Sequence, residues 1–188
     1  MSKEKLCMIL FLSLIFFIQI PAQDIDVEKH PGYINLEEIE IPSESERIID
    51  ISLGPAFLRF INDFLNDKRD EDSRILEGII SIRVKSFDIR LKDTDKIRSI
   101  MKQIEEKLGR EKWERLVRVK DEDELIDVSM KFEEEKPVGL LLMALDPGEE
   151  AAFVNIIGKD IDMKTLGCIR MGLKDSFLDC LTRRLHWN

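Results

Sequence analysis

Hydrophobic and polar residues alternate along several short stretches of the chain, which is the pattern of β-strands that bury one face. This alternation predicts strands at 48–53, 80–91, 116–120 and 126–132. Two further stretches, 139–145 and 153–157, are apolar at nearly every position and predict central strands that are buried on both faces. The turn sequence Asp146-Pro147-Gly148 lies between them and predicts a hairpin.

The alternation changes phase within 80–91. The apolar residues are even-numbered up to Val84 and odd-numbered from Phe87 onward. A shift by one residue is what a β-bulge produces. We therefore predict a bulge near Lys85 and Ser86.

Helical spacing of apolar residues predicts two helices among these strands. The first follows Gly54-Pro55 and is expected to face the core with the stripe Phe57, Phe60, Ile61 and Phe64. The second begins near Asp93 and is expected to end at Gly109 in a left-handed conformation; its stripe is Ile97, Ile100, Met101, Ile104 and Leu108.

The end of the chain predicts two weaker helices, at 162–171 and 174–185, the latter with Phe177, Leu178, Leu181 and Leu185 on one side. Strands that outnumber helices and follow one another by short turns favour an antiparallel arrangement. We predict an α+β fold, with a mostly antiparallel sheet of about six strands and helices packed on one face.

The first residues have the organisation of a secretory signal peptide. A short basic start with Lys3 and Lys5 precedes the uncharged apolar run 6–20, which Pro21 and Ala22 then end. A retained membrane anchor is the alternative, but 15 apolar residues fall short of the roughly 20 needed to span a bilayer. We predict cleavage near Ala22 and export to the periplasm, the cell surface or the medium.

This cleavage divides the chain into a signal peptide at 1–22, an irregular lead-in segment at 23–46 and a single α+β domain at 47–188. The charge is −9, and loss of the signal segment, which carries a net +1, leaves −10. An acidic surface is repelled by phosphate backbones, so nucleic acid is not an expected partner. Alternating basic residues are typical of a solvent-exposed sheet face, which we predict for Arg83 with Lys85 and for Arg115 with Arg118 and Lys120.

Two cysteines, Cys168 and Cys180, remain after loss of Cys7 with the signal segment. Both occupy apolar positions of predicted helices, which favours two buried thiols. A disulfide between them stays open as the alternative, because an exported chain meets oxidising conditions.

The residues from 31 to about 170 resemble an exported bacterial family catalogued as domain of unknown function 4252. The resemblance lies in the segments PGYINLEEIEIP, IDISLGPAFLRF, LEGIISIRVKSFDI and KWERLVRVKDEDELIDVSMKF, and most specifically in GLLLMALDPGEEAAFVNIIGKDIDMKTL. It implies a small envelope or secreted protein without an assigned activity, and it supplies no functional residues.

No catalytic, cofactor-binding or metal-binding constellation is evident, and we expect no cofactor. The two histidines, His30 and His186, lie beside opposite ends of the chain, and the acidic runs lack calcium-loop spacing. Trp113 and Tyr33 are the weak candidates for surface contacts, although a partly buried anchor is the more ordinary role of such a tryptophan.

These features favour an exported, non-enzymatic module that binds an envelope or extracellular protein and meets the membrane only through its signal peptide. A carrier of a small apolar ligand or lipid, held between helices and sheet, is the alternative. An exported hydrolase built on carboxylates comes third, because facing carboxylates can be distant in sequence.

Overall fold

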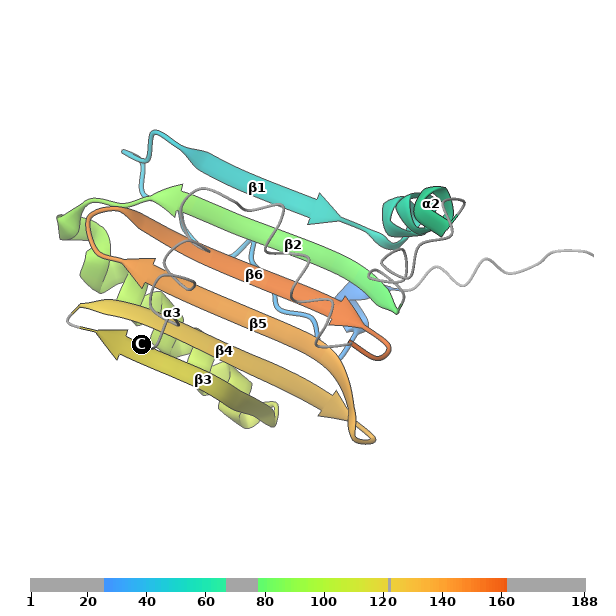
Figure 1. Cartoon of the computed structure of the whole chain (residues 1–188). Coiled ribbons are helices and arrows are strands. Elements are labelled where there is room, and N and C mark those ends of the chain that lie inside the picture. The colour runs from blue at the N-terminus through green and yellow to red at the C-terminus, as the bar shows by residue number, and fades with distance from the viewer. Residues whose placement is uncertain (1–25, 67–77, 122, 162–188) are drawn as a thin grey trace, which may run out of the picture.

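Six strands form one antiparallel sheet in the computed structural model, which describes residues 26–66, 78–121 and 123–161 (Figure 1). Their order across the sheet is β1-β2-β6-β5-β4-β3. The strands are β1 (Ile48–Leu53), β2 (Ile79–Asp88), β3 (Trp113–Asp121), β4 (Glu124–Glu133), β5 (Lys136–Asp146) and β6 (Glu150–Gly158). With two helices packed on this sheet, the predicted α+β fold is confirmed.

The long connection from β2 to β3 carries the chain from one side of the sheet to the other. It contains helix α3 (Thr94–Arg110), which lies behind the sheet in Figure 1 and contacts β3 and β5. Strands β3 to β6 then form consecutive hairpins, as predicted for β5 and β6. Helix α2 (Pro55–Asn66) follows β1 directly and packs against β2 at one end of the sheet. Two short 3-10 helices, η1 (Val27–Lys29) and η3 (Leu91–Asp93), complete the described elements.

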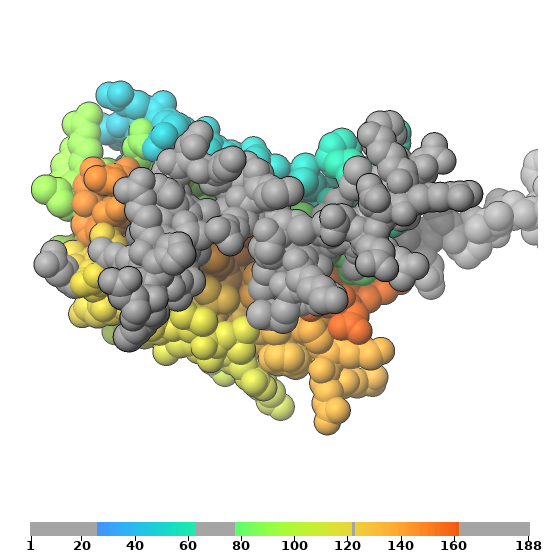
Figure 2. Space-filling model, viewed as in Figure 1, coloured from blue at the N-terminus to red at the C-terminus, as the bar shows by residue number. Residues whose placement is uncertain are grey.

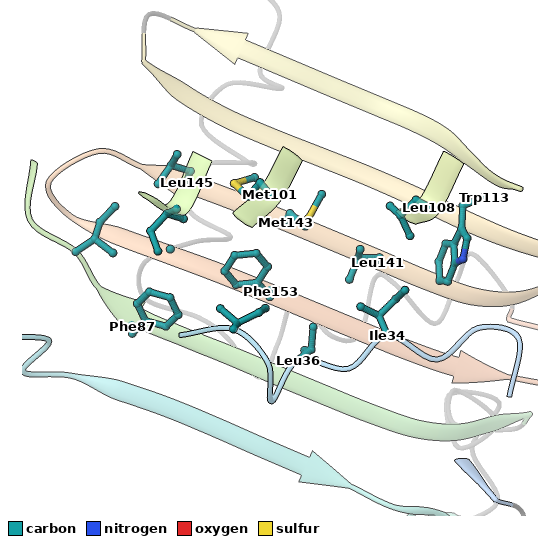
Figure 3. Close-up of a cluster of buried hydrophobic side chains, with 14 residues drawn as sticks. Ile34, Leu36, Phe87, Met101, Leu108, Trp113, Leu141, Met143, Leu145 and Phe153 are labelled. Atoms are coloured by element: carbon teal, nitrogen blue, oxygen red, sulfur yellow. The ribbon is translucent and has the colours of Figure 1, made fainter. Parts of the chain in front are cut away.

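The larger core lies on the face that α3 covers, which we call the inner face. Residues 31–41 cross this face beside α3, and we call them the strap. Figure 3 shows side chains of the strap, of α3 and of the strands directed toward one another. Phe87 and Phe153 stack at its centre with ring centroids 6.3 Å apart. The other buried members are Ile34, Leu36, Ile39, Ile89, Ile97, Met101, Leu108, Trp113, Leu141, Met143, Leu145 and Ala151.

The opposite face of the sheet, the outer face, is also apolar. Its clusters contain Ile79, Val84, Ile126, Met130, Leu140, Ala144, Ala152, Val154 and Ile156, joined by Leu58 of α2 and by Ile161. Strands β5 and β6 therefore bury apolar side chains on both faces, as their sequences predict.

The bulge predicted near Lys85 and Ser86 is wrong. Strands β2 and β6 pair in a continuous register from Ser81 to Asp88, and the only irregularity in the described pairing of these strands lies between Ile79 and Ser81. The apparent change of phase arises because β2 is covered on both sides, so that polar residues of the inner face alternate with apolar residues of the outer face.

Two details of the predicted helices are also wrong. Helix α3 continues through Gly109 to Arg110, and the left-handed residue that follows it is Lys112, with a φ of 59°. Of the α2 side chains that the structure describes, at 55–62, Leu58 is buried, whereas Phe57 and Phe60 are exposed. Because α2 touches the sheet only near its end, the helix turns Leu58 inward, and Phe60 lies about 200° around the helix axis from it.

Several predictions concern residues outside the described ranges. They are the signal peptide at 1–22, the helices at 162–171 and 174–185, and the residues Cys168, Cys180 and His186.

Candidate functional site

The strap is held against the sheet at three successive points. Gly32 lies so close to Gly139 of β5 that a Cβ on either glycine would meet the Cα of the other at 2.7 Å or less. The buried side chain of Asn155 on β6 accepts a hydrogen bond from the Ile34 N–H at 3.0 Å and donates to the carbonyl of Gly32 at 3.0 Å. The ammonium of Lys85 on β2 donates to the strap carbonyl of Leu36 at 2.9 Å. The strap is thus an integral layer of the fold.

This layer changes the role of the basic residues on β2. The solvent-exposed face predicted for Arg83 and Lys85 is wrong, because the strap crosses over both side chains; Lys85 is only 6% exposed. Asp50 of β1 approaches the Lys85 ammonium at 3.9 Å. Arg83 donates to the hydroxyl of Tyr33 at 3.1 Å and lies 4.9 Å from the centre of its ring.

The two aromatic candidates take different positions. Tyr33 is half-buried against Arg83, and burial raises the pKa of its phenol. Trp113 is only 8% exposed and belongs to the inner core, where its ring lies against Gly139. The structure does not bring Tyr33 and Trp113 together into one site among the described residues, and Trp113 offers no surface platform.

A group of four charged side chains joins α3 to the β3 side of the sheet. Asp127, fully buried on β4, accepts from Arg115 at 2.9 Å and from Arg118 at 2.8 and 2.9 Å. Both arginines also contact Glu105 of α3. The hydrogen bond between Arg118 and Glu105 raises the pKa of Arg118. Since two positive and two negative charges neutralise one another, we assign this group, the Asp127 quartet, to the stability of the fold.

An open hollow of about 640 Å³ lies between the strap and the end of α3. Most of its lining is charged or polar, with Glu28, His30, Tyr33, Asn35, Glu37, Glu38, Lys107, Glu111 and Lys131. His30 accepts from the Gly32 N–H through Nδ1 at 3.1 Å, and burial lowers its pKa. A hollow of this polarity does not suit an apolar ligand.

Strand β1 forms one edge of the sheet and is exposed along almost its whole length. Ile48, Ile49 and Ile51 are 52%, 36% and 37% exposed, and β1 runs along the margin of the molecule in Figure 2. The register with β2 contains no interruption over its six residue pairs. This strand is therefore regular, apolar and open to solvent.

Among the described residues, backbone groups of β1 at that edge have no hydrogen-bond partner. The N–H of Asp88 donates to the carbonyl of Arg47 at 3.2 Å, so this pair is a hydrogen-bonded pair of the antiparallel ladder. Hydrogen-bonded pairs alternate with non-bonded ones. The N–H and C=O groups of Ile48, Asp50 and Ser52 consequently point away from β2.

Helix α2 continues the exposed apolar surface from the end of β1. Gly54 alone separates the two elements, and Phe57 and Phe60 are 49% and 67% exposed. We call β1 and these two phenylalanines the β1 surface. The sequence predicts a strand at 48–53 and places the two phenylalanines in the core. It does not show this surface, because alternation does not reveal which strand will lie at an edge.

The described residues offer neither a metal site nor a membrane span as a second candidate. Within residues 26–66, 78–121 and 123–161, no three His, Cys, Asp or Glu side chains gather as a metal site. Among the helices of the same residues, none has the length and apolar character required to cross a membrane.

Comparison with known proteins identifies a family. The model of a family described as a domain of unknown function, DUF4252, matches residues 42–169. No curated protein and no solved structure matches the chain.

Proposed function

The chain belongs to the DUF4252 family, and since that description assigns no activity, we propose a function from the site itself: an exported, non-enzymatic module that binds an extended segment of a partner protein along β1. The observation that carries this proposal is the regular apolar edge of β1. A strand with unpaired N–H and C=O groups is a template for another strand, and peptide recognition by strand addition uses such edges.

The chemistry of the β1 surface indicates what kind of segment it would accept. Outward backbone groups at Ile48, Asp50 and Ser52 would provide the main-chain hydrogen bonds. Apolar side chains are exposed on both faces of the strand, since Ile48 shares the inner face with Phe87, and Ile51 the outer face with Val84. We therefore expect a partner segment that is extended and rich in apolar residues.

The charged groups inside the fold support a binding role over a catalytic one. Asp127 is engaged by two arginines and by the hydroxyl of Ser129, and Lys85 by a strap carbonyl. These groups hold the described layers together. The signal-like segment 1–22 supports export, which would bring the β1 surface to partners in the envelope or outside the cell.

Site-specific photo-cross-linking in the native cells tests this proposal. A benzophenone side chain replaces Asp50 on β1 in one variant and Glu114 on β3 in a matched control, since both acidic residues are exposed on edge strands. We expect one recurrent protein adduct from position 50 and none from position 114. Equal adducts from both edges, or an adduct only with another copy of this chain, would contradict the proposal.

A further inference from the structure

A small recess lies between β1 and the strap on the inner face, beside the open edge of the sheet. Its volume is about 30 Å³, and a cavity of roughly 10–15 Å³ already holds a water molecule. The strap, β1 and β2 line it with Leu36, Glu37, Asp50, Ser52, Arg83 and Lys85. The recess therefore adjoins two of the β1 residues whose backbone groups point toward a partner.

Arg83 brings a buried hydrogen-bond donor to this recess. A terminal nitrogen of its guanidinium donates to the Tyr33 hydroxyl at 3.1 Å and lies 3.5 Å from the Glu37 carboxylate. Its Nε is buried and has no hydrogen-bond partner among the described residues. An unsatisfied buried donor is costly, so an acceptor that enters the recess would gain the bond that Nε lacks.

The charges around the recess already balance one another. Arg83 lies 3.5 Å from Glu37, and Lys85 lies 3.9 Å from Asp50. A carboxylate in the recess would add a third negative charge to this group, and burial of an uncompensated charge is costly. An ammonium or guanidinium would add a third positive charge and leave Arg83 Nε unpaired. The group that fits is an acceptor without charge.

The geometry of strand addition limits which side chains of a partner can reach the recess. A partner residue that lies opposite Ser52 shares the inner face with it. Neighbouring strands are about 4.8 Å apart, and the recess lies beyond β1, over its boundary with β2. Only a long side chain crosses that distance, and the short side chain of Ser52 leaves a passage for it.

We propose, on the premise that a strand adds to β1, that the partner segment carries a glutamine opposite Ser52 and places its amide in the recess. The amide oxygen accepts a hydrogen bond from Arg83 Nε. The amide nitrogen donates to the Asp50 carboxylate, which is 3.9 Å from the Lys85 ammonium and thus not hydrogen-bonded to it. Asparagine, serine and threonine carry similar groups on side chains that are too short.

Selection from displayed peptides tests this specificity with the chain purified from its native cells. The probe is a phage-displayed library of short segments that have valine at alternate positions and every amino acid at the others. We expect glutamine to be enriched at one varied position. A synthetic peptide with this glutamine should bind about tenfold more tightly than its alanine counterpart, as for a hydrogen bond to a charged group.

Three variants of the chain separate the recess from the strand. Arg83→Lys keeps the positive charge and replaces Nε by a methylene group, so the advantage of glutamine over alanine should disappear. Ser52→Leu, on the exposed β1, closes the passage and should have the same effect, and it decides the question if Arg83→Lys lowers Tm. Ile51→Lys lies on the outer face and should weaken the glutamine and alanine peptides alike.

The two ways in which this experiment can fail are distinguishable. Absence of any enriched sequence, or binding that Ile51→Lys leaves unchanged, would contradict strand addition to β1 and the glutamine with it. Binding that depends on Ile51 but shows no advantage of glutamine over alanine would overturn the glutamine alone. So would a preference for lysine, arginine or glutamate, or an advantage of glutamine that persists in both recess variants.

Discussion

The two edge strands of the sheet, β1 and β3, differ in the features that prevent an edge from pairing with another chain. Strand β3 has nine residues, of which five are charged, and its register with β4 is interrupted between Arg115 and Val117. Strand β1 has six residues with one charge, Asp50, and an uninterrupted register with β2. Charges and bulges are the devices by which natural sheets prevent edge-to-edge association.

This difference indicates that the two edges serve different purposes. The charges of β3 are also structural, because Arg115 and Arg118 hold Asp127 and tie the edge to Glu105 of α3. The side chains of Ile48 and Ile51 carry no charge and stay exposed. An apolar edge strand without charges or bulges exposes a free protein to aggregation. The presence of such an edge at β1 therefore favours the interpretation that a partner covers it.

The largest effect on stability is expected from disrupting the Asp127 quartet, which holds the charged side chains of β3. The substitution Asp127→Ala leaves the partly exposed Arg115 and Arg118 with Glu105, and loss of a hydrogen bond to a charged group costs about 1.5–3 kcal/mol. We expect the free energy of unfolding, measured in urea, to fall by that amount. Amides of β3 should exchange faster with solvent, while those of β2 beside β1 keep their protection.

An exposed pair provides the control for this substitution. Asp123, whose side chain is 80% exposed, binds Arg98 at 3.1 Å. Asp123→Ala should change the free energy of unfolding by less than about 1 kcal/mol. If Asp127→Ala proved equally mild, the quartet would not stabilise this edge.

The next effect concerns the backbone of β1. Because the Ser52 N–H points away from β2, Ser52→Pro removes no bond of the sheet but takes one donor from the open edge. We expect the yield of the partner adduct at position 50 to fall by about fivefold, as for loss of one hydrogen bond of about 1 kcal/mol. Ile51→Pro, which removes a bond to β2, should instead destabilise the fold. Undiminished adduct with Ser52→Pro would contradict strand addition.

A smaller effect is expected on α2. Phe57 and Phe60 are exposed, so the double substitution to Ser should change the free energy of unfolding by less than about 0.5 kcal/mol for each residue. The same change should weaken partner binding severalfold if α2 extends the β1 surface. The control is Leu58→Ser, at a position that is 2% exposed. This substitution should destabilise the fold while leaving the exposed phenylalanines of α2 in place. Unchanged binding would restrict the site to β1.

The smallest effect is a pH dependence of the strap, which should leave both edges unaltered. Burial lowers the pKa of His30 below its ordinary value of 6.5, so the unfolded chain binds a proton more readily than the folded one. The stability held by neutral His30 is complete above pH 6.5 and declines as the pH falls below it. His30→Gln should flatten this part of the dependence of Tm on pH, and an unchanged curve would contradict the assignment.

The strands and their hairpins could be predicted because alternation records burial directly. The position of each strand across the sheet could not be predicted in this way. Strand β2 lies next to β6, far along the chain, and this long-range pairing decides that β1 and β3 become the edges. The strap explains the false bulge, since Lys85 is polar in sequence but is buried in the fold, where the carbonyl of Leu36 accepts a hydrogen bond from its ammonium.

The candidate site was hidden for the same reason. Ile48, Ile49 and Ile51 belong to a predicted strand, and Phe57 and Phe60 to a helical stripe that is expected to face the core. Their exposure follows from where β1 and α2 lie relative to the rest of the sheet. The absence of strong charge from β1 was visible in the sequence, but it acquires meaning only once β1 is known to be an edge.

Strand β1, and not β3, is the edge that we propose receives a partner. Ile51 and Val119 make the most direct test, because they lie on the same face of the sheet at opposite edges and are 37% and 38% exposed. Affinity for the cross-linked partner is measured for Ile51→Lys and Val119→Lys by titration calorimetry. We expect Ile51→Lys to weaken binding by about tenfold or more, as for loss of about 1.4 kcal/mol, and Val119→Lys to leave it unchanged. Equal loss from both substitutions, or loss from Val119→Lys alone, would contradict it.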